Sequence, residues 1–427
     1  MINVRQAAYL SVLRHYKENR FSNLEIDSAI KKYGFTGPDR SLFTVIVYGS
    51  IERRITLDYY LSACSVKPVD SLDPEVMAIL LTGAYQILFL DRVPDHAAVN
   101  EAVECAKKYK PASKGFVNAV LRKLISVKDS LELPSDRIKN LSVRYSMPEW
   151  IVSLWQEQYG DAEDILCGID KPPTITLRTN TLVNTRAELM EKLGDTPCEY
   201  TETSPDGIHI LRGISFEELE ELCGNGAYVQ DEASQMAVRA VDAVPGEFII
   251  DTCCCPGGKT FGIAMCMENK GKVLALDLHK SKLSLVEKGA NRLGIDIIET
   301  REHNSKNAIP EYIGSADRVL CDVPCSGLGV VAKKPETRYK NREDIARLPE
   351  IQYAILQASS SYLRSGGTLV YSTCTLNKSE NENIVGRFIS ENSGYILENM
   401  TTYFPKAGKT DGFFVAKIKK TSEEKIL

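Results

Sequence analysis

The sequence predicts a multidomain protein with three parts: an all-α bundle, a small α+β insert and a doubly wound α/β domain. Apolar residues recur with helical spacing through the first 128 residues. Residues 171–225 mix short strand-like and helical runs, and from residue 226 strands and helices alternate, which indicates a parallel sheet. The 427 residues are long enough for about two to four domains of ordinary size.

The segment 1–128 predicts a compact helical bundle. Apolar residues recur at helical spacing in "NVRQAAYLSVLRHY", "RSLFTVIVYGSIERRITLDYYLSAC" and "PEVMAILLTGAYQILFL". Pro74 follows Asp73 and suits the first position of a helix. Pro111 separates "DHAAVNEAVECAKKY" from "SKGFVNAVLRKLI". Helices joined by such short loops pack as antiparallel neighbours.

Residues 129–170 predict a linker with a short helix, and residues 171–225 predict the small α+β insert. The strand-like runs of the insert are "TITLRTN" and "GIHIL", and its helical runs are "TRAELMEKL" and "FEELEEL". No internal repeat or low-complexity tract interrupts them.

Residues 226–420 predict the doubly wound domain. Its expected strands are "GEFIIDTCC", "GKVLALDLH", "IIETREHN", "ADRVLCDVP" and "TLVYSTCT". The helical region before the last of these is expected to end at Gly366 and Gly367. Ligands of such sheets bind beyond the carboxyl ends of the strands, and every candidate residue below lies at such an end.

Composition narrows the class of protein. No window of about 18 apolar residues occurs, and the N-terminal helix lacks the apolar core of a secretion signal, so we expect a cytoplasmic protein without a membrane span. The twelve cysteines are irregularly spaced and form no C-x-x-C pair, so we expect reduced thiols and no metal site. A net charge of −5 argues against a purely electrostatic nucleic-acid binder.

Local charge is more informative than the total. The stretch from Lys107 to Lys123 holds six basic residues and no acidic one, and Val331 to Arg342 holds five basic residues and one Glu. Both stretches could neutralise phosphates, and both could equally be solvated helix or loop faces.

The first strand end predicts a nucleotide-like ligand. In "DTCCCPGGKT", Gly257 and Gly258 allow close approach of the backbone, and the following helix offers free N–H groups to a carboxylate or phosphate. Asp277, at the next strand end, suits a ribose diol. A G-x-G-x-x-G motif is missing, and Cys253 replaces the first glycine of a Walker A loop, so S-adenosylmethionine is the better candidate. An ordinary strand–turn–helix is the plain alternative.

Two later strand ends carry thiols. Cys325 follows Asp322 in "RVLCDVPCSGLG", and Cys374 lies in "LVYSTCTLN". Lys259 on a neighbouring strand end could lower a thiol pKa, and Asp322 could hold a substrate ring nitrogen. A thiolate, an acid and a methyl donor together suit methylation at C5 of a pyrimidine, where addition of sulfur to C6 activates C5. Free cysteines are otherwise usually small buried hydrophobes, and the residues alone do not say which thiol attacks.

The motifs "DTCCCPGGKT", "ALDLH", "DVPCSGLG", "KPETRYK", "YSTCT" and "DGFFVAKIKK", in this order, resemble the RNA cytosine-C5 methyltransferases of the NOL/NOP/Sun family. The segment 1–128 resembles the NusB-type RNA-binding fold. The resemblance implies a Rossmann-like catalytic domain and assigns the attacking thiol to Cys374 and product release to Cys325. It also implies that Asp322 contacts the cytosine with Lys259 beside it. The cofactor-binding residues implied are Cys253, Cys254, Cys255, Pro256, Gly257, Gly258, Lys259, Asp277, Asn304 and Asp322.

Two positions depart from the family pattern. Cys254 and Cys255 stand where the family usually has Ala-Ala, which makes the loop bulkier. Asn304 stands where an Asp usually contacts the adenine; its carbonyl oxygen still accepts a hydrogen bond but carries no charge.

The resemblance therefore implies an enzyme that makes 5-methylcytosine in 16S rRNA with S-adenosylmethionine as cofactor. The expected partner is free or partly assembled small-subunit RNA, and the expected state is a monomer. A tRNA cytosine-C5 methyltransferase is the first alternative, because the catalytic motifs do not distinguish substrates. An inactive RNA-binding or antitermination factor is the second, and the intact Cys325, Cys374 and Lys259 argue against it.

Overall fold

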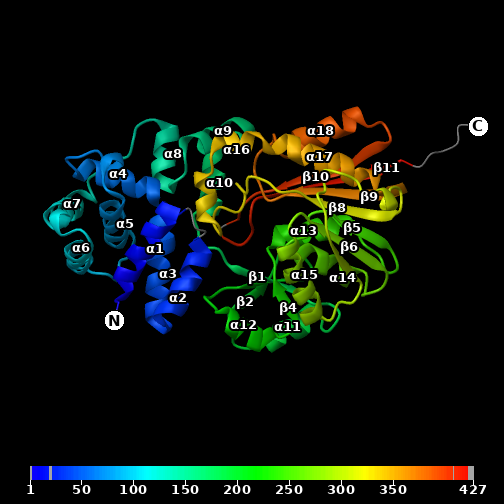
Figure 1. The fold of residues 1–427 in the computed structure, drawn as a ribbon, viewed down its shortest axis with the longest axis horizontal. Coiled ribbons are helices and arrows are strands. Elements are labelled where there is room, and N and C mark those ends of the chain that lie inside the picture. Colours follow the sequence, from blue (N-terminus) through cyan, green and yellow to red (C-terminus); the bar gives the residue numbers. More distant parts are fainter. Residues whose placement is uncertain (1, 19–21, 407, 422–427) are drawn as a thin grey trace, which may run out of the picture. The chain divides into compact units, whose positions relative to one another are not determined.

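The computed structural model describes residues 2–18, 22–406 and 408–421. The chain divides into two compact units, of which the first comprises Met1–Glu163 with Lys334–Tyr339, and the second Asp164–Lys333 with Lys340–Leu427. In Figure 1 most of the first unit is coloured blue to cyan, and most of the second runs from green to red. No helix in the described part of the chain has both the length and the apolar character needed to cross a bilayer.

The first unit is all-helical. Its helices are α1 (Val4–Glu18), α2 (Ser22–Tyr33), α3 (Gly37–Glu52), α4 (Arg54–Cys64), α5 (Pro74–Phe89), α6 (Asp95–Tyr109), α7 (Lys114–Val127), α8 (Arg137–Tyr145) and α9 (Glu149–Tyr159), with short 3-10 turns at Val69–Ser71, Pro111–Ser113 and Pro335–Tyr339. Helix α5 is apolar on nearly all sides because it is buried among its neighbours. Its start is as predicted: Pro74 is the first helical residue, and the Asp73 carboxylate accepts from the Glu75 N–H.

Two parts of the bundle differ from expectation. The run around residues 41–64 forms two helices, since Arg53 has φ −90° and ψ 18° and separates α3 from α4. Helix α2 was not predicted from the sequence. The basic stretch from Lys107 to Lys123 is partly neutralised, because Lys107 pairs with Glu104 and Lys110 pairs with Asp73.

The turn at Pro335–Tyr339 belongs to the first unit although its neighbours in sequence belong to the second. The Arg338 side chain is 1% exposed, and its Nη1 donates to the backbone oxygens of Glu52 (2.9 Å) and Ser146 (3.3 Å). The Tyr339 hydroxyl donates to the Ile51 oxygen at 3.0 Å. The basic stretch 331–342 was expected either to contact phosphates or to form a solvated face. For Arg338 both expectations are wrong, because its side chain is buried and hydrogen-bonded to main-chain carbonyls.

The second unit begins at Asp164, within α10 (Ala162–Ile169), and contains the predicted α+β insert. A four-stranded antiparallel sheet of order β2-β3-β1-β4 is formed by β1 (Ile175–Thr179), β2 (Cys198–Tyr200), β3 (Gly207–Ile210) and β4 (Ala227–Val229). Helices α11 (Arg186–Lys192) and α12 (Phe216–Cys223) accompany it. A capping box between Thr185 and Glu188 starts α11.

The larger sheet has the order β10-β11-β9-β8-β5-β6-β7. Its strands are β5 (Phe248–Asp251), β6 (Lys272–Asp277), β7 (Ile298–Glu302), β8 (Ala316–Asp322), β9 (Leu363–Thr373), β10 (Tyr395–Tyr403) and β11 (Phe413–Lys420). The five strands from β7 to β9 are parallel, as predicted, and β11 and β10 add an antiparallel edge. The strand order reverses between β5 and β8, the usual place for a ligand in such sheets.

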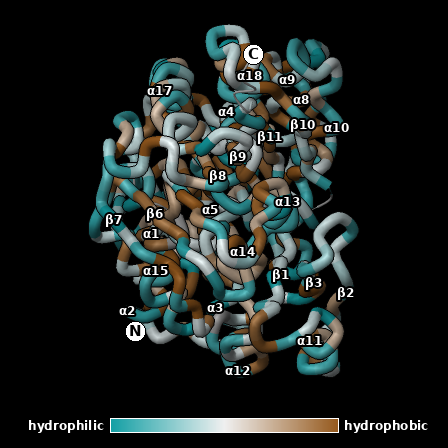
Figure 2. The backbone as a smooth tube through the Cα atoms, turned by 90° about the vertical axis from the view of Figure 1, so that its right-hand side faces the viewer, coloured by the Kyte–Doolittle hydropathy of each residue, from teal (hydrophilic) through white to brown (hydrophobic). Residues whose placement is uncertain are grey.

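Helices cover both faces of this sheet (Figure 1). They are α13 (Glu232–Val241), α14 (Gly258–Cys266), α15 (Lys280–Leu293), α16 (Arg342–Ala346), α17 (Leu348–Ser361) and α18 (Glu382–Glu391), with a 3-10 turn at Pro310–Tyr312. Successive strand residues point to opposite faces: Ile249 packs with α13–α15, and Ile250 packs with α17 and α18. The inner strands are accordingly rich in hydrophobic residues, which are coloured brown in Figure 2.

The predicted helix end at Gly366 and Gly367 is wrong. Helix α17 ends at Ser361, and both glycines lie inside β9. Tyr362 and Leu363 are buried in the core and carry the chain straight into the strand. Gly366, with φ +72°, then allows the irregularity that shifts the pairing of β9 with β8.

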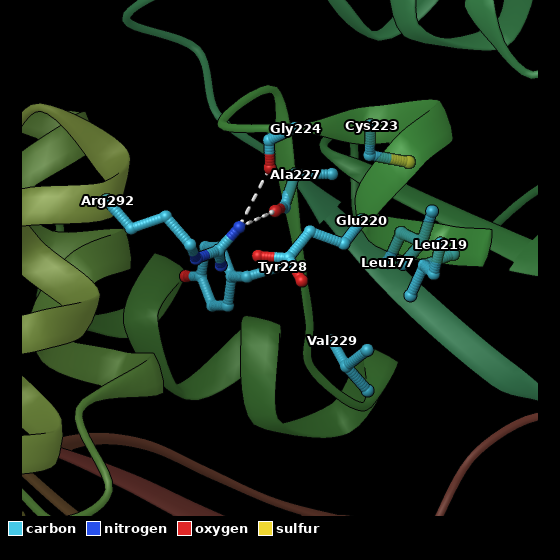
Figure 3. A pocket seen from close by; sticks show the side chains of 9 residues that line it. All are labelled: Leu177, Leu219, Glu220, Cys223, Gly224, Ala227, Tyr228, Val229 and Arg292. Carbon is cyan, nitrogen blue, oxygen red and sulfur yellow. Dashed lines mark hydrogen bonds between the residues drawn. The ribbon is translucent and has the colours of Figure 1, made fainter. Parts of the chain in front are cut away.

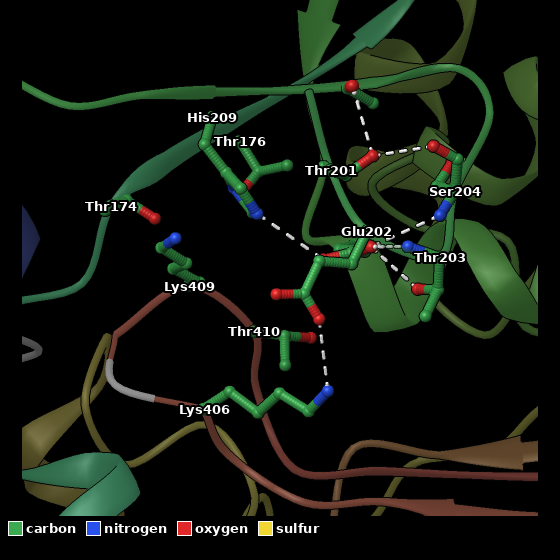
Figure 4. A network of polar contacts seen from close by, with 12 residues as sticks. Thr174, Thr176, Thr201, Glu202, Thr203, Ser204, His209, Lys406, Lys409 and Thr410 are labelled. Carbon is green, nitrogen blue, oxygen red and sulfur yellow. Dashed lines mark hydrogen bonds and ion pairs between the residues drawn. The ribbon is translucent and has the colours of Figure 1, made fainter. Parts of the chain in front are cut away.

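The small sheet is tied to the loop between β10 and β11. Lys406 pairs with Glu202 at 3.3 Å (Figure 4). At the base of the same network, His209 lies 3.4 Å from Glu232, which starts α13. Burial of Glu232 opposes its ionisation, but hydrogen bonds from His209 and Thr203 lower its pKa to about 2. The insert is thus anchored to the sheet that carries the site.

We expect Arg338→Ala to destabilise the first unit by about 2–4 kcal/mol, because it leaves a cavity and unpaired buried carbonyls. Hydrogen exchange should show faster exchange around Glu52 and Ser146. Arg137→Ala is the matched control, since that arginine is 62% exposed and should change stability by less than about 0.5 kcal/mol. Equal protection in both variants would contradict the role given to Arg338.

Candidate active site

A cavity of about 240 Å³ opens beside the carboxyl ends of β5, β8 and β9. It is lined by Val229, Gln230, Asp231, Ser234, Asp251, Cys253, Cys254, Cys255, Pro256, Gly258, Lys259, Asp322, Val330, Cys374, Asp411 and Phe413. Eight residues that the sequence singled out are therefore on the cavity wall. They are Cys253, Cys254, Cys255, Pro256, Gly258, Lys259, Asp322 and Cys374.

The two thiols singled out by sequence lie together. The register of the parallel strands pairs Asp322 of β8 with Ser372 of β9, so the chain segments that follow emerge side by side. The sulfur atoms of Cys325 and Cys374 are 3.2 Å apart. The interaction with Cys374, burial and the nearby Glu380 carboxylate all raise the pKa of Cys325. A raised pKa favours the protonated thiol at Cys325, which can donate its S–H to a Cys374 thiolate.

A half-buried ion pair supplies charge beside these thiols. Lys259 Nζ lies 2.7 Å from Asp322 Oδ2, and the Ser372 hydroxyl donates to Asp322 Oδ1 at 2.7 Å. Burial alone would lower the pKa of Lys259, but Asp322, with a smaller contribution from Cys374, raises it. Lys259 therefore stays cationic next to Cys374 and favours a thiolate there.

The glycine loop after β5 is shaped to receive a ligand. Gly257 has φ +113°, and the following helix α14 has no side-chain cap on its first N–H groups. Gln230 Nε2 lies buried against this wall without a hydrogen-bond partner among the described residues. A Cβ on Gly258 would meet that nitrogen at 3.6 Å. Uncapped helical N–H groups beside an unpaired amide suit the carboxylate of an amino-acid-bearing ligand such as S-adenosylmethionine.

The three consecutive cysteines of this loop are not activated. Burial, followed by the Asp277 carboxylate, raises the pKa of Cys255 to about 12. The pKa values of Cys253 and Cys254 are also raised, chiefly by burial. They line the cavity as protonated, apolar groups, and Asp251 behind them has a pKa raised by burial to about 7.

Three residues predicted to contact the cofactor do not line the cavity: Gly257, Asp277 and Asn304. Asp277 ends β6, is half-buried and accepts from the His279 N–H at 2.8 Å. Asn304 is exposed and accepts from the Lys306 N–H at 3.3 Å. Contacts of Asp277 with ribose and of Asn304 with adenine remain predictions.

A second charged cluster on the wall was missed from sequence. Lys333 Nζ lies 2.5 Å from Asp231 and 2.9 Å from Asp411. Burial, together with Asp231, raises the pKa of Asp411 to about 7. Two signals were available: Asp411 starts "DGFFVAKIKK", and Lys333 lies in the basic stretch 331–342. Asp231 lies in a run without a recognisable motif.

A separate cavity of about 270 Å³ lies at β4 (Figure 3). Arg292 Nη1 donates there to the backbone oxygens of Gly224 (2.8 Å) and Ala227 (3.3 Å). The guanidinium of Arg292 thus fastens α15 to the small sheet, and burial raises the pKa of the nearby Cys223. The chemistry belongs to the first cavity.

Three family models match the chain. Residues 238–419 match 16S rRNA methyltransferase RsmB/F, residues 2–126 match the NusB family, and residues 147–217 match the ferredoxin-like domain of RsmF/B-like methyltransferases.

Full-length relatives give the same picture. The chain is 34% identical to the "Probable ribosomal RNA small subunit methyltransferase B" of Bacillus subtilis, over 98% of this chain and 99% of that protein. It is 30% identical to ribosomal RNA small subunit methyltransferase B of Thermus thermophilus, over 98% of both. Among solved structures, PH0851 superposes with a TM-score of 0.83 at 25% identity, covering 98% of this chain and 99% of that one. NSun6 from Pyrococcus horikoshii, at 22% identity, shares the fold with a TM-score of 0.57 over 65% of this chain and 99% of that one.

Gly257→Ala should weaken binding of S-adenosylhomocysteine about tenfold, because a side chain at positive φ costs about 1–2 kcal/mol. The added Cβ would also meet the Phe261 ring at 2.4 Å. Calorimetric titration measures the affinity. Gly246→Ala is the matched control: that glycine has φ +90° with open space around it, so the variant should lose stability but keep its affinity. An unchanged affinity in Gly257→Ala would show that the loop does not hold the ligand.

Proposed function

The chain belongs to the family of ribosomal RNA small subunit methyltransferases B, and on that premise we propose that it makes 5-methylcytosine in 16S rRNA through a covalent bond between Cys374 and the base. One observation carries the mechanism: two thiols 3.2 Å apart stand beside a half-buried lysine–aspartate pair and the glycine loop. S-adenosylmethionine supplies an electrophilic methyl group when it is bound.

The residues divide the chemistry between them. C5 of cytosine is a poor nucleophile. Addition of the Cys374 sulfur to C6 turns C5 into the carbon of an enamine, which can attack a methyl group. Lys259 stabilises the attacking thiolate by its charge. Asp322 already accepts from Lys259 and Ser372, so it acts as a carboxylate and can accept a hydrogen bond from the 4-amino group. Uracil has an oxygen at that position, which the same carboxylate would repel.

Cys325 is suited to the release step. Its largest pKa-raising contact is the hydrogen bond with Cys374. Once the Cys374 sulfur is bonded to C6, that contact is lost, and Cys325 gives up its proton more readily. Its thiolate can then take the proton from C5, which restores the double bond and expels Cys374.

The target cytosine has to leave any stack or pair, because C5 and C6 must reach a thiol on the wall of a cavity. We therefore expect the substrate to be free or partly assembled small-subunit RNA, with the enzyme acting as a monomer. A tRNA substrate remains the alternative. Two observations favour the ribosome: residues 2–126 of this chain match the NusB family, and a relative matched over its full length is named for ribosomal RNA. Thiol catalysis also requires a reducing compartment, consistent with a cytoplasmic protein.

Deletion of the gene tests the substrate. Mass spectrometry of nucleosides from purified 16S rRNA should show the loss of one 5-methylcytosine, restored by the wild-type gene but not by Cys374→Ala. Parallel analysis of tRNA should show no change. Unaltered 16S rRNA with a loss in tRNA would replace the proposed substrate by the alternative.

Cys325→Ala should accumulate a covalent protein–RNA adduct, because the base can be attacked but not released. A denaturing gel with labelled RNA and S-adenosylmethionine detects it. Cys374→Ala and the double variant should form none. Cys167→Ala, at an exposed thiol that does not line the cavity, should turn over like the wild type. An adduct in Cys374→Ala would reverse the roles of the two thiols.

A further inference from the structure

A buried carboxylate that the mechanism above does not use lies behind the two catalytic thiols. Glu380 is 0% exposed and lies in the segment between β9 and α18. Desolvating a carboxylate costs several kcal/mol unless hydrogen bonds compensate for it. Its partners therefore indicate what the residue does.

The carboxylate holds the loop that carries Cys325. Glu380 Oε2 accepts from the Ser326 backbone N–H at 2.8 Å, and Oε1 accepts from the Ser326 hydroxyl at 2.6 Å. Gln352 Nε2 also donates to Oε2 at 2.9 Å and to the Pro324 oxygen at 3.0 Å. The residues before and after Cys325 are thus both fixed by this cluster.

The same cluster holds the loop that carries Cys374. Ser326 Oγ lies 2.6 Å from Thr375 Oγ1; since the single Ser326 hydroxyl proton goes to Glu380, Thr375 is the donor. Asn377 Nδ2 donates to Glu380 Oε1 at 2.9 Å. A continuous chain of hydrogen bonds therefore runs from the residue after Cys374, through the residue after Cys325, to Glu380.

The charge of Glu380 also distinguishes the two thiols. It contributes to the raised pKa of Cys325, after the contact with Cys374 and burial. Two other titratable groups lie near Cys325. Burial raises the pKa of Tyr371, so this side chain stays neutral. Lys340 Nζ donates to the backbone oxygen of Ser326, the next residue, at 2.7 Å. The Lys259–Asp322 pair lies with Cys374 on the cavity wall. The negative charge of Glu380 thus acts on Cys325, while the cation Lys259 lies beside Cys374.

We propose that Glu380 is a positioning residue: it sets the spacing of the two thiols and keeps Cys325 protonated, so that the thiolate forms at Cys374. The functional consequence of this inference rests on the proposed covalent mechanism. Its first test, alkylation of the two cysteines, requires neither RNA nor cofactor.

Alkylation by iodoacetamide, followed at each cysteine by peptide mass spectrometry across pH, tests it on the full-length protein. Glu380→Gln keeps the shape and removes the charge, so Cys325 should react at a pH about one unit lower, with about tenfold more modification at neutral pH. Glu380→Asp keeps the charge and should retain the protection of Cys325. Glu382→Gln is the matched control: its carboxylate accepts from Thr402, and both cysteines should react as in the wild type.

A purely structural Glu380 would give another pattern. Unchanged alkylation profiles in Glu380→Gln, or equal gains in Glu380→Gln and Glu380→Asp, would overturn the proposal. Should Glu380→Gln fail to fold, Ser326→Ala removes the hydroxyl link but leaves the charge. It should then slow release of the covalent RNA adduct about tenfold without exposing Cys325 to alkylation, and normal release would count against the positioning role. Absence of 5-methylcytosine activity in the wild type would refute the function, whatever the alkylation shows.

Discussion

The parallel pairing of β8 with β9 is the constraint on which the site depends. It places Asp322 opposite Ser372, and the two segments beyond them leave the sheet at the same edge. Because neighbouring strands lie about 4.8 Å apart, two side chains just past their ends can touch. The sulfur contact between Cys325 and Cys374 is a consequence of that spacing, and so is the hydrogen bond from Ser372 to Asp322.

Charge then gives the two similar thiols different roles. Lys259 reaches the same edge from α14 and is held there by Asp322. Glu380 is buried near Cys325, and its carboxylate accepts hydrogen bonds from amide and hydroxyl donors. The low-dielectric interior strengthens both effects, since neither group is fully solvated. The difference between the thiols therefore comes from their surroundings and not from the residue type.

The local patterns predicted most of the fold. The period of the apolar residues predicted the bundle, and alternation of strands and helices predicted the parallel sheet. The failures have a tertiary cause: the glycines at 366 and 367 lie inside β9 because Tyr362 and Leu363 are drawn into the core. The buried Arg338 donates to the carbonyls of Glu52 and Ser146, which are 286 and 192 residues away in sequence. No local sequence window contains such partners. Glu380 lies in the polar run "NKSENEN", whose composition is typical of a solvated helix start.

By itself, the sequence determined which reactive groups exist and that each one stands at a strand end, since strand periodicity and a reactive residue after the strand are both local features. Its motifs also indicated the family to which the protein belongs. Only the tertiary structure decided which groups meet. It brought Asp411 and Gln230 to the cavity wall and paired Lys333 with Asp411. It left Asn304 and Asp277 off the wall and joined Glu380 to Ser326. Such contacts depend on strand order and register, which are set by long-range packing that no short stretch of residues encodes.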